Sequence, residues 1–256
     1  MTHDLSELTW PEAEAAAREG AVVVIPTGAH EQHGHHLPLG TDTMLVTAVA
    51  RRAIDQVRAR VPVFYTPTIW LGFSPHHMDF PGTISLPTDV YLAVVTEACR
   101  SLWQHGFRRL VLINGHGGNT SPLRTAVMDL RAREGIRVAV FSYWDLAAPF
   151  IRSWRRSEEG GINHACEMET ALMLHTHGPL VHMDKAVRHI PATSSAYFGR
   201  DLVAPGRVVT GSRVRDRSDT GVMGDPTLAT PERGRELCEA IVVEIARFLE
   251  EAATWP

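Results

Sequence analysis

A segment near the start of the chain gathers four histidines, a glutamate and an aspartate into the thirteen residues from His30 to Asp42. Glu31 and His33 lie two positions apart, so on an extended segment both side chains leave the same side of the backbone. Asp42 follows a turn of proline and glycine, and its two oxygens can bridge two cations. Carboxylates and imidazoles together are the ligands of Zn, Mn and Fe(II) sites. We therefore predict that Glu31, His33 and Asp42 form the first half of a site for two divalent ions.

A second segment, Asn114–Asn119, places His116 among glycines. Glycines permit tight turns and let an ion or ligand approach the backbone closely. We therefore predict that His116 is a metal ligand and that Gly117 and Gly118 contact substrate. A phosphate-binding loop or the oxyanion loop of an α/β-hydrolase would be the alternatives. The chain has no GxGxxG, GxxxxGK[ST] or GxSxG motif, which argues against both.

The third segment is Gly160–Thr170. His164 and Glu167 lie three residues apart, which would make them neighbours on one face of a helix that begins here. Glu167 is predicted to be both a metal ligand and a catalytic residue. His164 is predicted to carry a proton in catalysis rather than to bind metal. A glutamate in a first helical turn can instead balance the helix dipole, but that does not explain His164 or the two glycines before it. Glu169 would point elsewhere on the helix and is predicted to be structural.

Two further residues are predicted to line a substrate pocket. His77 lies with His76 in a long loop rich in proline and glycine, the kind of loop that often borders a site. Trp144 follows a predicted strand and is expected to form an aromatic wall, although a tryptophan in that position is as often part of a core.

Hydrophobic patterns alternate between buried strands and amphipathic helices, which predicts an α/β fold with a mostly parallel sheet. Strands are expected over 21–26, 61–65, 110–113 and 136–142, and helices over 43–57, 88–103, 122–133, 166–175 and 232–251. The ligand-rich segments follow the first and third strands, and Trp144 follows the fourth. In open parallel sheets, ligand sites form beyond the carboxyl ends of the strands. We therefore expect one shared site.

Composition limits the classes of function. The chain has 256 residues, a length that suits one domain over 1–256. Its formal net charge of −4 gives no electrostatic reason to expect binding to nucleic acid or to an anionic membrane. No apolar stretch approaches the roughly 20 residues of a membrane span. The acidic N-terminus is unlike a signal peptide, and three widely spaced cysteines fit reduced thiols. A cytoplasmic protein is expected.

The three segments, with Phe80–Ser85 and Gly221–Pro226, resemble the creatininase (creatinine amidohydrolase) family over about residues 20 to 230. The resemblance implies a three-layer αβα fold, two divalent metal ions (Zn, Mn or Fe(II)), a small-molecule amide substrate and a homo-oligomer, often a hexamer. It implies as ligands Glu31, His33, Asp42, His116 and a late glutamate. The expected reaction is hydrolysis of a C–N amide bond by a hydroxide that bridges the two ions, with His164 as general acid.

One position departs from the family pattern. Creatininase itself has a glutamate two residues after the histidine of the glycine loop, and here that position is Gly118. Glu167 is expected to take over, as in relatives with the His-Gly-Gly loop. Creatinine as substrate is therefore in doubt, and a cyclic amide, a formamide or a related small molecule is expected. The alternatives are a peptidase that trims a cofactor-precursor peptide and a non-catalytic metal-binding subunit.

Overall fold

Four parallel strands form the central sheet of the computed structural model, which describes residues 3–192, 195, 197–199, 201–204 and 206–256. The strands lie in the order β2-β1-β3-β4. Their bounds are Val22–Thr27 (β1), Val63–Tyr65 (β2), Arg109–Asn114 (β3) and Val138–Ser142 (β4). Thr27 pairs with Asn114, and Asn114 pairs with Ser142. Three strands therefore end at the same level, and the loops that follow them leave from one edge of the sheet.

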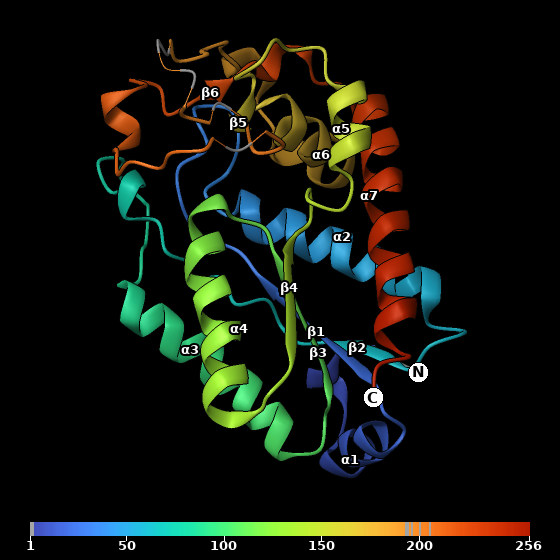
Figure 1. Cartoon of the computed structure of the whole chain (residues 1–256). Helices are drawn as coiled ribbons and strands as arrows, with labels where there is room; N and C mark the ends of the chain where they lie inside the picture. The colour runs from blue at the N-terminus through green and yellow to red at the C-terminus, as the bar shows by residue number, and fades with distance from the viewer. Residues whose placement is uncertain (1–2, 193–194, 196, 200, 205) are drawn as a thin grey trace.

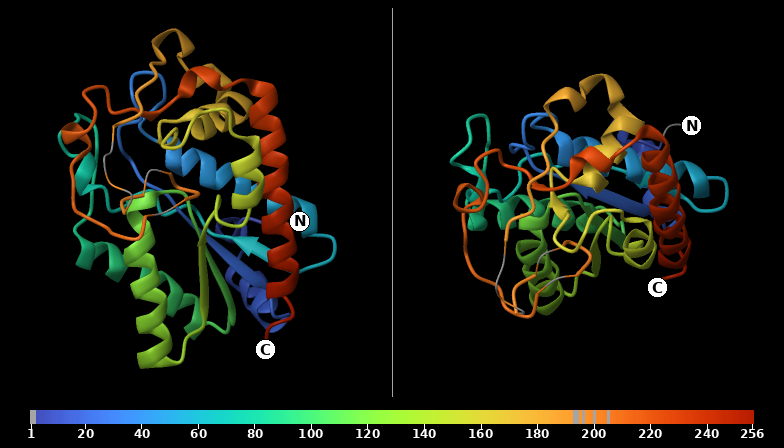
Figure 2. Two further views of the ribbon diagram at one scale, coloured as in Figure 1. Left: turned by 45° about the horizontal axis from the view of Figure 1, so that its top comes forward. Right: turned by 90° about the horizontal axis from the view of Figure 1, so that it is seen from above.

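Helices cover both faces of this sheet. Their bounds are Trp10–Arg18 (α1), Thr41–Val57 (α2), Thr88–Gln104 (α3), Thr120–Glu134 (α4), Ala148–Trp154 (α5), Glu167–His177 (α6) and Pro231–Ala252 (α7). Side chains alternate between the faces of a strand, so Val22 and Val24 join the core beneath α2 and α7, whereas Val23 and Ile25 join the core beneath α3 and α4. Figure 2 shows the sheet between α4 and α7. The predicted three-layer α/β fold with a parallel sheet is confirmed.

A smaller layer lies over the carboxyl edge of the sheet (Figure 1). It consists of α5, α6 and an antiparallel pair of short strands, Ile162–His164 (β5) and Met223–Gly224 (β6). The antiparallel pair brings the segment before α6 next to a segment sixty residues further along the chain. This layer closes the edge from which the ligand-rich loops emerge.

Each predicted strand and helix is present, with ends displaced by a few residues. The helix predicted over 166–175 begins at Glu167, and His164 belongs to β5 instead. Between them Ala165 adopts φ 49°, a left-handed conformation that separates strand from helix. The prediction that His164 and Glu167 share a helix face is therefore wrong.

Two helices and two short strands were not predicted. Helix α1 begins at a capping box between Thr9 and Glu12, a signal that the sequence carries. Helix α5 has only seven residues, and β5 and β6 are too short to show a period-2 pattern. Within the described ranges, no helix is both long and apolar enough to cross a membrane.

Candidate metal centre

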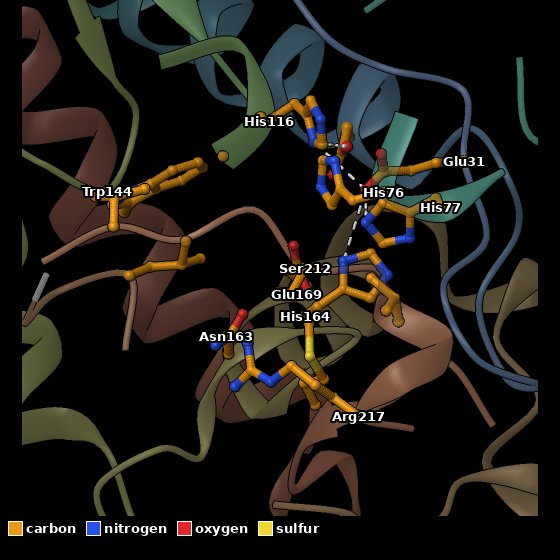
Figure 3. Close-up of a pocket in the computed structure, with 17 residues that line it drawn as sticks. Glu31, His76, His77, His116, Trp144, Asn163, His164, Glu169, Ser212 and Arg217 are labelled. Carbon is orange, nitrogen blue, oxygen red and sulfur yellow. Dashed lines mark ion pairs between the residues drawn. The ribbon is translucent and has the colours of Figure 1, made fainter. Parts of the chain in front are cut away.

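The carboxylate of Glu31 lies among imidazole rings in the loop that follows β1 (Figure 3). Its Oε1 is 3.2 Å from Nε2 of His77, 3.3 Å from Nδ1 of His116 and 3.6 Å from Nδ1 of His164. These histidines come from three separate segments, and the side chain of Glu31 is fully buried. The loops after β1 and β3 therefore converge with β5 on one carboxylate, as the predicted shared site requires.

Asp42 lies in the first turn of α2 and points its two oxygens at different imidazoles. Oδ1 is 3.0 Å from Nε2 of His33, and Oδ2 is 3.1 Å from Nδ1 of His116. The helix begins after Gly40, so neither Thr41 nor Asp42 is the N-cap, and the Asp42 side chain is left to the site. A carboxylate placed between two imidazoles in this way can bridge two cations.

The proton on each of three histidines is fixed by a backbone carbonyl on the outer side of the site. The outer nitrogens are Nδ1 of His33, Nε2 of His116 and Nε2 of His164. Their acceptors are the carbonyls of Glu31, Phe73 and Gln32, at 3.1, 3.1 and 2.7 Å. An imidazole that donates from one nitrogen presents the other as a lone pair, and this is how metal-binding histidines are oriented.

Gln32 fixes His77 so that an N–H, rather than a lone pair, points into the site. Its Oε1 accepts a hydrogen bond from the amide of Gly34 at 2.9 Å, which leaves its NH₂ group as the donor. That group lies 2.9 Å from Nδ1 of His77, 3.0 Å from Nε2 of His164 and 3.2 Å from the carbonyl of Gly221. Nδ1 of His77 is therefore an acceptor, and its Nε2–H points at Glu31. No sequence pattern indicates a role for Gln32, because nothing in the sequence shows that Gly221 lies beside it.

Glu169 faces the site, contrary to the prediction that it points away. Its Oε1 is 3.9 Å from Nε2 of His33, and it lines the same pocket as Glu31 and Asp42. It sits at the third position of α6 after the N-cap Cys166, whose backbone N–H donates to Oε2 of Glu169 at 3.3 Å. The sequence signal for this placement is the spacing of three residues from the N-cap.

Glu167 faces away from the cluster. Its Oε1 accepts hydrogen bonds from the amide of Arg156 at 2.9 Å and from Nη2 of Arg233 at 2.6 Å, and its Oε2 accepts one from the amide of Ser157 at 2.8 Å. Both oxygens are thus occupied by donors that hold α6 against the turn after α5 and the start of α7. The predicted role of Glu167 as ligand and catalytic residue is wrong in this geometry, because residues 167 and 169 project about 200° apart on a helix.

In the cluster, burial and the attraction between opposite charges act on the pKa values in opposite directions. Burial favours the neutral form of the Glu31 carboxyl, yet His116 and His77 outweigh it and hold its pKa well below the usual value. Burial also disfavours the imidazolium of His33, but Asp42 raises the His33 pKa to about 9. Burial raises the pKa of Glu169 to about 7. Without metal, protons occupy positions between these ligands that a cation would take.

Unsatisfied oxygens indicate what the cluster lacks. Both carboxylate oxygens of Glu31 and Oδ2 of Asp42 are buried, and among the described residues no contact to them has hydrogen-bond geometry, although imidazole nitrogens of His77 and His116 lie close by. A buried carboxylate without partners is costly unless a cation compensates it. Triplets with ligand atoms within 4.8 Å of one another include Glu31, His33 and Asp42 and also His33, His164 and Glu169. This donor set fits divalent transition metals.

The cluster forms the floor of a pocket of about 400 Å³ (Figure 3). All four predicted substrate contacts line this pocket, namely His77, Trp144, Gly117 and Gly118. The pocket is completed by residues for which the sequence predicts no role, including Asn163, Leu202, Val209, Ser212, Val214, Arg217 and Met223. Most of these lie in the segment before β6, which has no regular periodicity that would have revealed them.

Gly118 leaves no room for a side chain. A Cβ at this position would overlap Nε2 of His116 and the carbonyl of Phe73. The neighbouring Gly117 is different, since a Cβ there would meet only Leu202 at 3.5 Å. A glutamate at position 118 is therefore incompatible with this backbone, and a carboxylate must reach the site from another element.

Comparisons with known proteins point to one family. The family model described as "Creatininase: Creatinine amidohydrolase" matches residues 6–249. The chain is 34% identical to the creatinine amidohydrolase of Pseudomonas putida, with 96% of each chain covered. It is 36% identical to the mycofactocin precursor peptide peptidase of Mycobacterium ulcerans, with 94% of this chain and 86% of the relative covered.

Solved structures of the same kind superpose on the whole chain. A creatininase with Mn gives a TM-score of 0.81 at 31% identity, with 100% of both chains covered. A mutant creatininase of Zn-Zn type gives a TM-score of 0.82 at 31% identity, again with 100% of both chains covered. The motifs that resemble this family lie in a chain that also shares its fold.

Proposed function

This chain belongs to the creatininase family, and we propose that it is a metal-dependent hydrolase of a C–N amide bond in a small molecule. The observation that carries the proposal is Asp42, whose two oxygens face His33 and His116 at 3.0 and 3.1 Å on the floor of the pocket. A bridging carboxylate between buried imidazoles is the arrangement of a two-metal hydrolytic site.

The ligands divide into two sets that share Asp42. Glu31 and His116 would hold one divalent ion with Oδ2 of Asp42. His33 and Glu169 would hold the other with Oδ1 of Asp42. In this assignment Glu169 replaces the predicted Glu167, and Zn, Mn or Fe(II) all suit the donor set.

Bound divalent ions supply positive charge that acidifies water and polarises a carbonyl. The protein supplies the proton path. The Nε2–H of His164 is held by the carbonyl of Gln32 at 2.7 Å, so Nδ1 is the nitrogen that faces the pocket. We propose that Nδ1 takes a proton during attack and returns it to the leaving nitrogen, which refines the predicted general acid.

The remaining pocket residues would place the substrate. His77 directs its Nε2–H toward the floor of the pocket, where it can donate to a substrate carbonyl oxygen or to Glu31. Trp144 is buried and offers an apolar wall that keeps water from the amide. Gly117 and Gly118 allow the substrate to approach the backbone closely.

A peptidase is the second candidate, because the pocket continues beyond the site. A further cavity of about 410 Å³ shares Asn163, Leu202 and Arg217 with the first. A cleft of that extent has space for a peptide, and one relative is described as a precursor peptide peptidase.

Metal analysis with a substrate panel tests the proposal. Protein purified without chelator should contain close to two divalent ions per chain and should hydrolyse at least one of creatinine, simple formamides or short peptides. Creatinine and formamide turnover would favour the small-molecule amidohydrolase, and peptide turnover alone would favour the peptidase. Two bound ions with no turnover of any substrate would point to a non-catalytic metal-binding subunit.

Assembly and location stay predictions. We propose a homo-oligomer, as the resemblance to the creatininase family implies. Light scattering of the purified chain would test the oligomer. The proposed cytoplasmic location would be tested by cell fractionation.

A further inference from the structure

One wall of the active-site pocket carries a positive charge. Of the described residues that line the pocket above the ligands, Arg217 is the only lysine or arginine. It also lines the second cavity, so it stands where the two cavities meet. Figure 3 shows its side chain extending toward Asn163, with His116 at the opposite end of the view. A substrate that fills both cavities would therefore pass the guanidinium.

The guanidinium of Arg217 has no carboxylate partner within the part of the chain that the structure describes, whereas its neighbours are paired. Arg213 lies 3.2 Å from Asp79. Arg215 donates to the carbonyl of Asp219 at 2.8 Å and stacks over Phe80 at 4.3 Å. Of these three arginines at alternate positions, the one without a carboxylate partner among the described residues is the one that lines the pocket.

The backbone holds Arg217 in place although its side chain is exposed. Its amide donates to the carbonyl of Val214 at 2.9 Å, and its carbonyl accepts from Nε2 of His189 at 2.7 Å. The Cα of Arg217 is therefore fixed by two hydrogen bonds. A planar guanidinium on a fixed backbone is suited to a carboxylate, because two parallel N–H groups can bind its two oxygens.

We infer that Arg217 binds a carboxylate of the substrate, at the end of the molecule away from the bond that is cleaved. The inference rests on the proposed function, because it takes the cleaved amide to lie at the ligand cluster. The pocket that holds both the cluster and Arg217 is also lined by the apolar side chains of Trp144, Val214 and Met223. The substrate is thus an amide with an apolar middle and a carboxylate end.

Two kinds of molecule share this chemistry, a short peptide with a free C-terminus and an N-acyl amino acid. Matched probes distinguish them. The peptide pair is leucyl-alanyl-leucine with a free or an amidated C-terminus. The small-molecule pair is N-formyl-leucine and its amide. Each pair differs only in the carboxylate that Arg217 would bind.

The variants are R217Q, R217K and, as a matched control, R215Q. Arg215 is an exposed arginine two residues away that does not line the pocket. In the metal-loaded protein, R217Q should raise KM for the acid of the preferred pair about tenfold, the effect of losing a charged hydrogen bond, and leave its amide unchanged. R217K should recover part of the loss, and R215Q should match wild type. An equal effect of R217Q on acid and amide, or an effect below twofold on the acid, would overturn the inference.

Binding measurements separate this inference from the proposed function. Isothermal titration of the metal-free wild type with the same four probes needs no hydrolysis. Tighter binding of the acids than of the amides, lost in R217Q, would support the carboxylate site even if no probe were hydrolysed. Hydrolysis with equal binding of acid and amide would keep the proposed function and reject the role of Arg217. Failure to bind any acid would reject it also.

Discussion

The side-chain amide of Gln32 lies 2.9 Å from Nδ1 of His77 and fixes the tautomer of that imidazole. The amide cannot turn over without losing the hydrogen bond that Oε1 accepts from Gly34. His77 is therefore an Nε2–H donor toward the site, whereas His33, His116 and His164 would present lone pairs once metal ions are bound. Burial lowers the pKa of His77 well below its usual value, which keeps it neutral. Gln32 thus makes His77 a hydrogen-bond donor, unlike the histidines that are predicted to bind metal.

Replacing Gln32 by glutamate should reverse this tautomer. A carboxylate beside Nδ1 of His77 accepts a proton instead of donating one, so the proton should move from Nε2 to Nδ1. Nitrogen NMR of the imidazole should show the change, and kcat should fall about 10- to 100-fold, the usual cost of losing a supporting hydrogen bond at such sites. A His77 spectrum identical to wild type would refute the assignment.

Asp42→Asn should empty both metal positions. The amide keeps the size of the side chain but offers only one oxygen and no charge, so neither ion retains its shared ligand. Elemental analysis should find well under one ion per chain. Asp145→Asn is the control, because Asp145 accepts a hydrogen bond from the amide of Ser142 and does not line the site pocket. Retention of two ions in the Asp42 variant would contradict the bridge.

Glu169→Gln and Glu167→Gln should have different effects. The Glu169 variant should lose one ion of two and keep its stability. The Glu167 variant should keep both ions when folded but lose about 3 kcal/mol of unfolding free energy, because it leaves Arg233 partly buried without its charge partner. Metal content and chemical denaturation measure the two effects. The reverse pattern would restore the original prediction for Glu167.

Gly118→Ala should disturb the site, whereas Gly117→Ala should be tolerated. The added methyl group at position 118 would overlap His116 and the carbonyl of Phe73 and would displace a predicted ligand. At position 117 it would make only an ordinary van der Waals contact with Leu202. We expect the Gly118 variant to bind metal at least about tenfold more weakly, because it disturbs both the ligand and its carbonyl support. Equal metal titration curves for the two variants would show that the loop can shift.

Metal-free protein should lose stability as the pH rises from 6.5 through about 9. Asp42 raises the pKa of His33 from its ordinary 6.5 to about 9, so the stabilisation is complete below 6.5 and is lost as His33 deprotonates. Burial raises the Glu169 pKa to about 7, which gives the same sign. Melting temperatures in chelator should therefore fall over this range, and those of metal-loaded protein should fall less. A flat profile in chelator would argue against the protonated pair.

The sheet and most of the residues that gather in the cluster can be predicted from the sequence, because both depend on local patterns; that these residues bind metal stays a prediction. Val22–Ile25 is a continuous apolar run, and the ligand-rich loops follow strands whose ends align in the register from Thr27 to Ser142. The prediction for Glu167 is wrong in this geometry because it requires His164 and Glu167 to share a helix, and the left-handed Ala165 separates the strand of His164 from the helix of Glu167. Gln32 contacts His77 and Gly221, and Arg217 reaches the pocket from the segment before β6; no local pattern contains either relation.

The bonds of Glu167 set the rotational phase of α6. By holding Arg156, Ser157 and Arg233 on one side of the helix, they turn Glu169 to the opposite side, where the ligands are. Each residue added or removed between Ala165 and Glu169 would rotate the carboxylate by about 100° and take it out of the site. The number of residues in this short stretch is therefore constrained as tightly as their identity, and insertions that other loops tolerate would be selected against here.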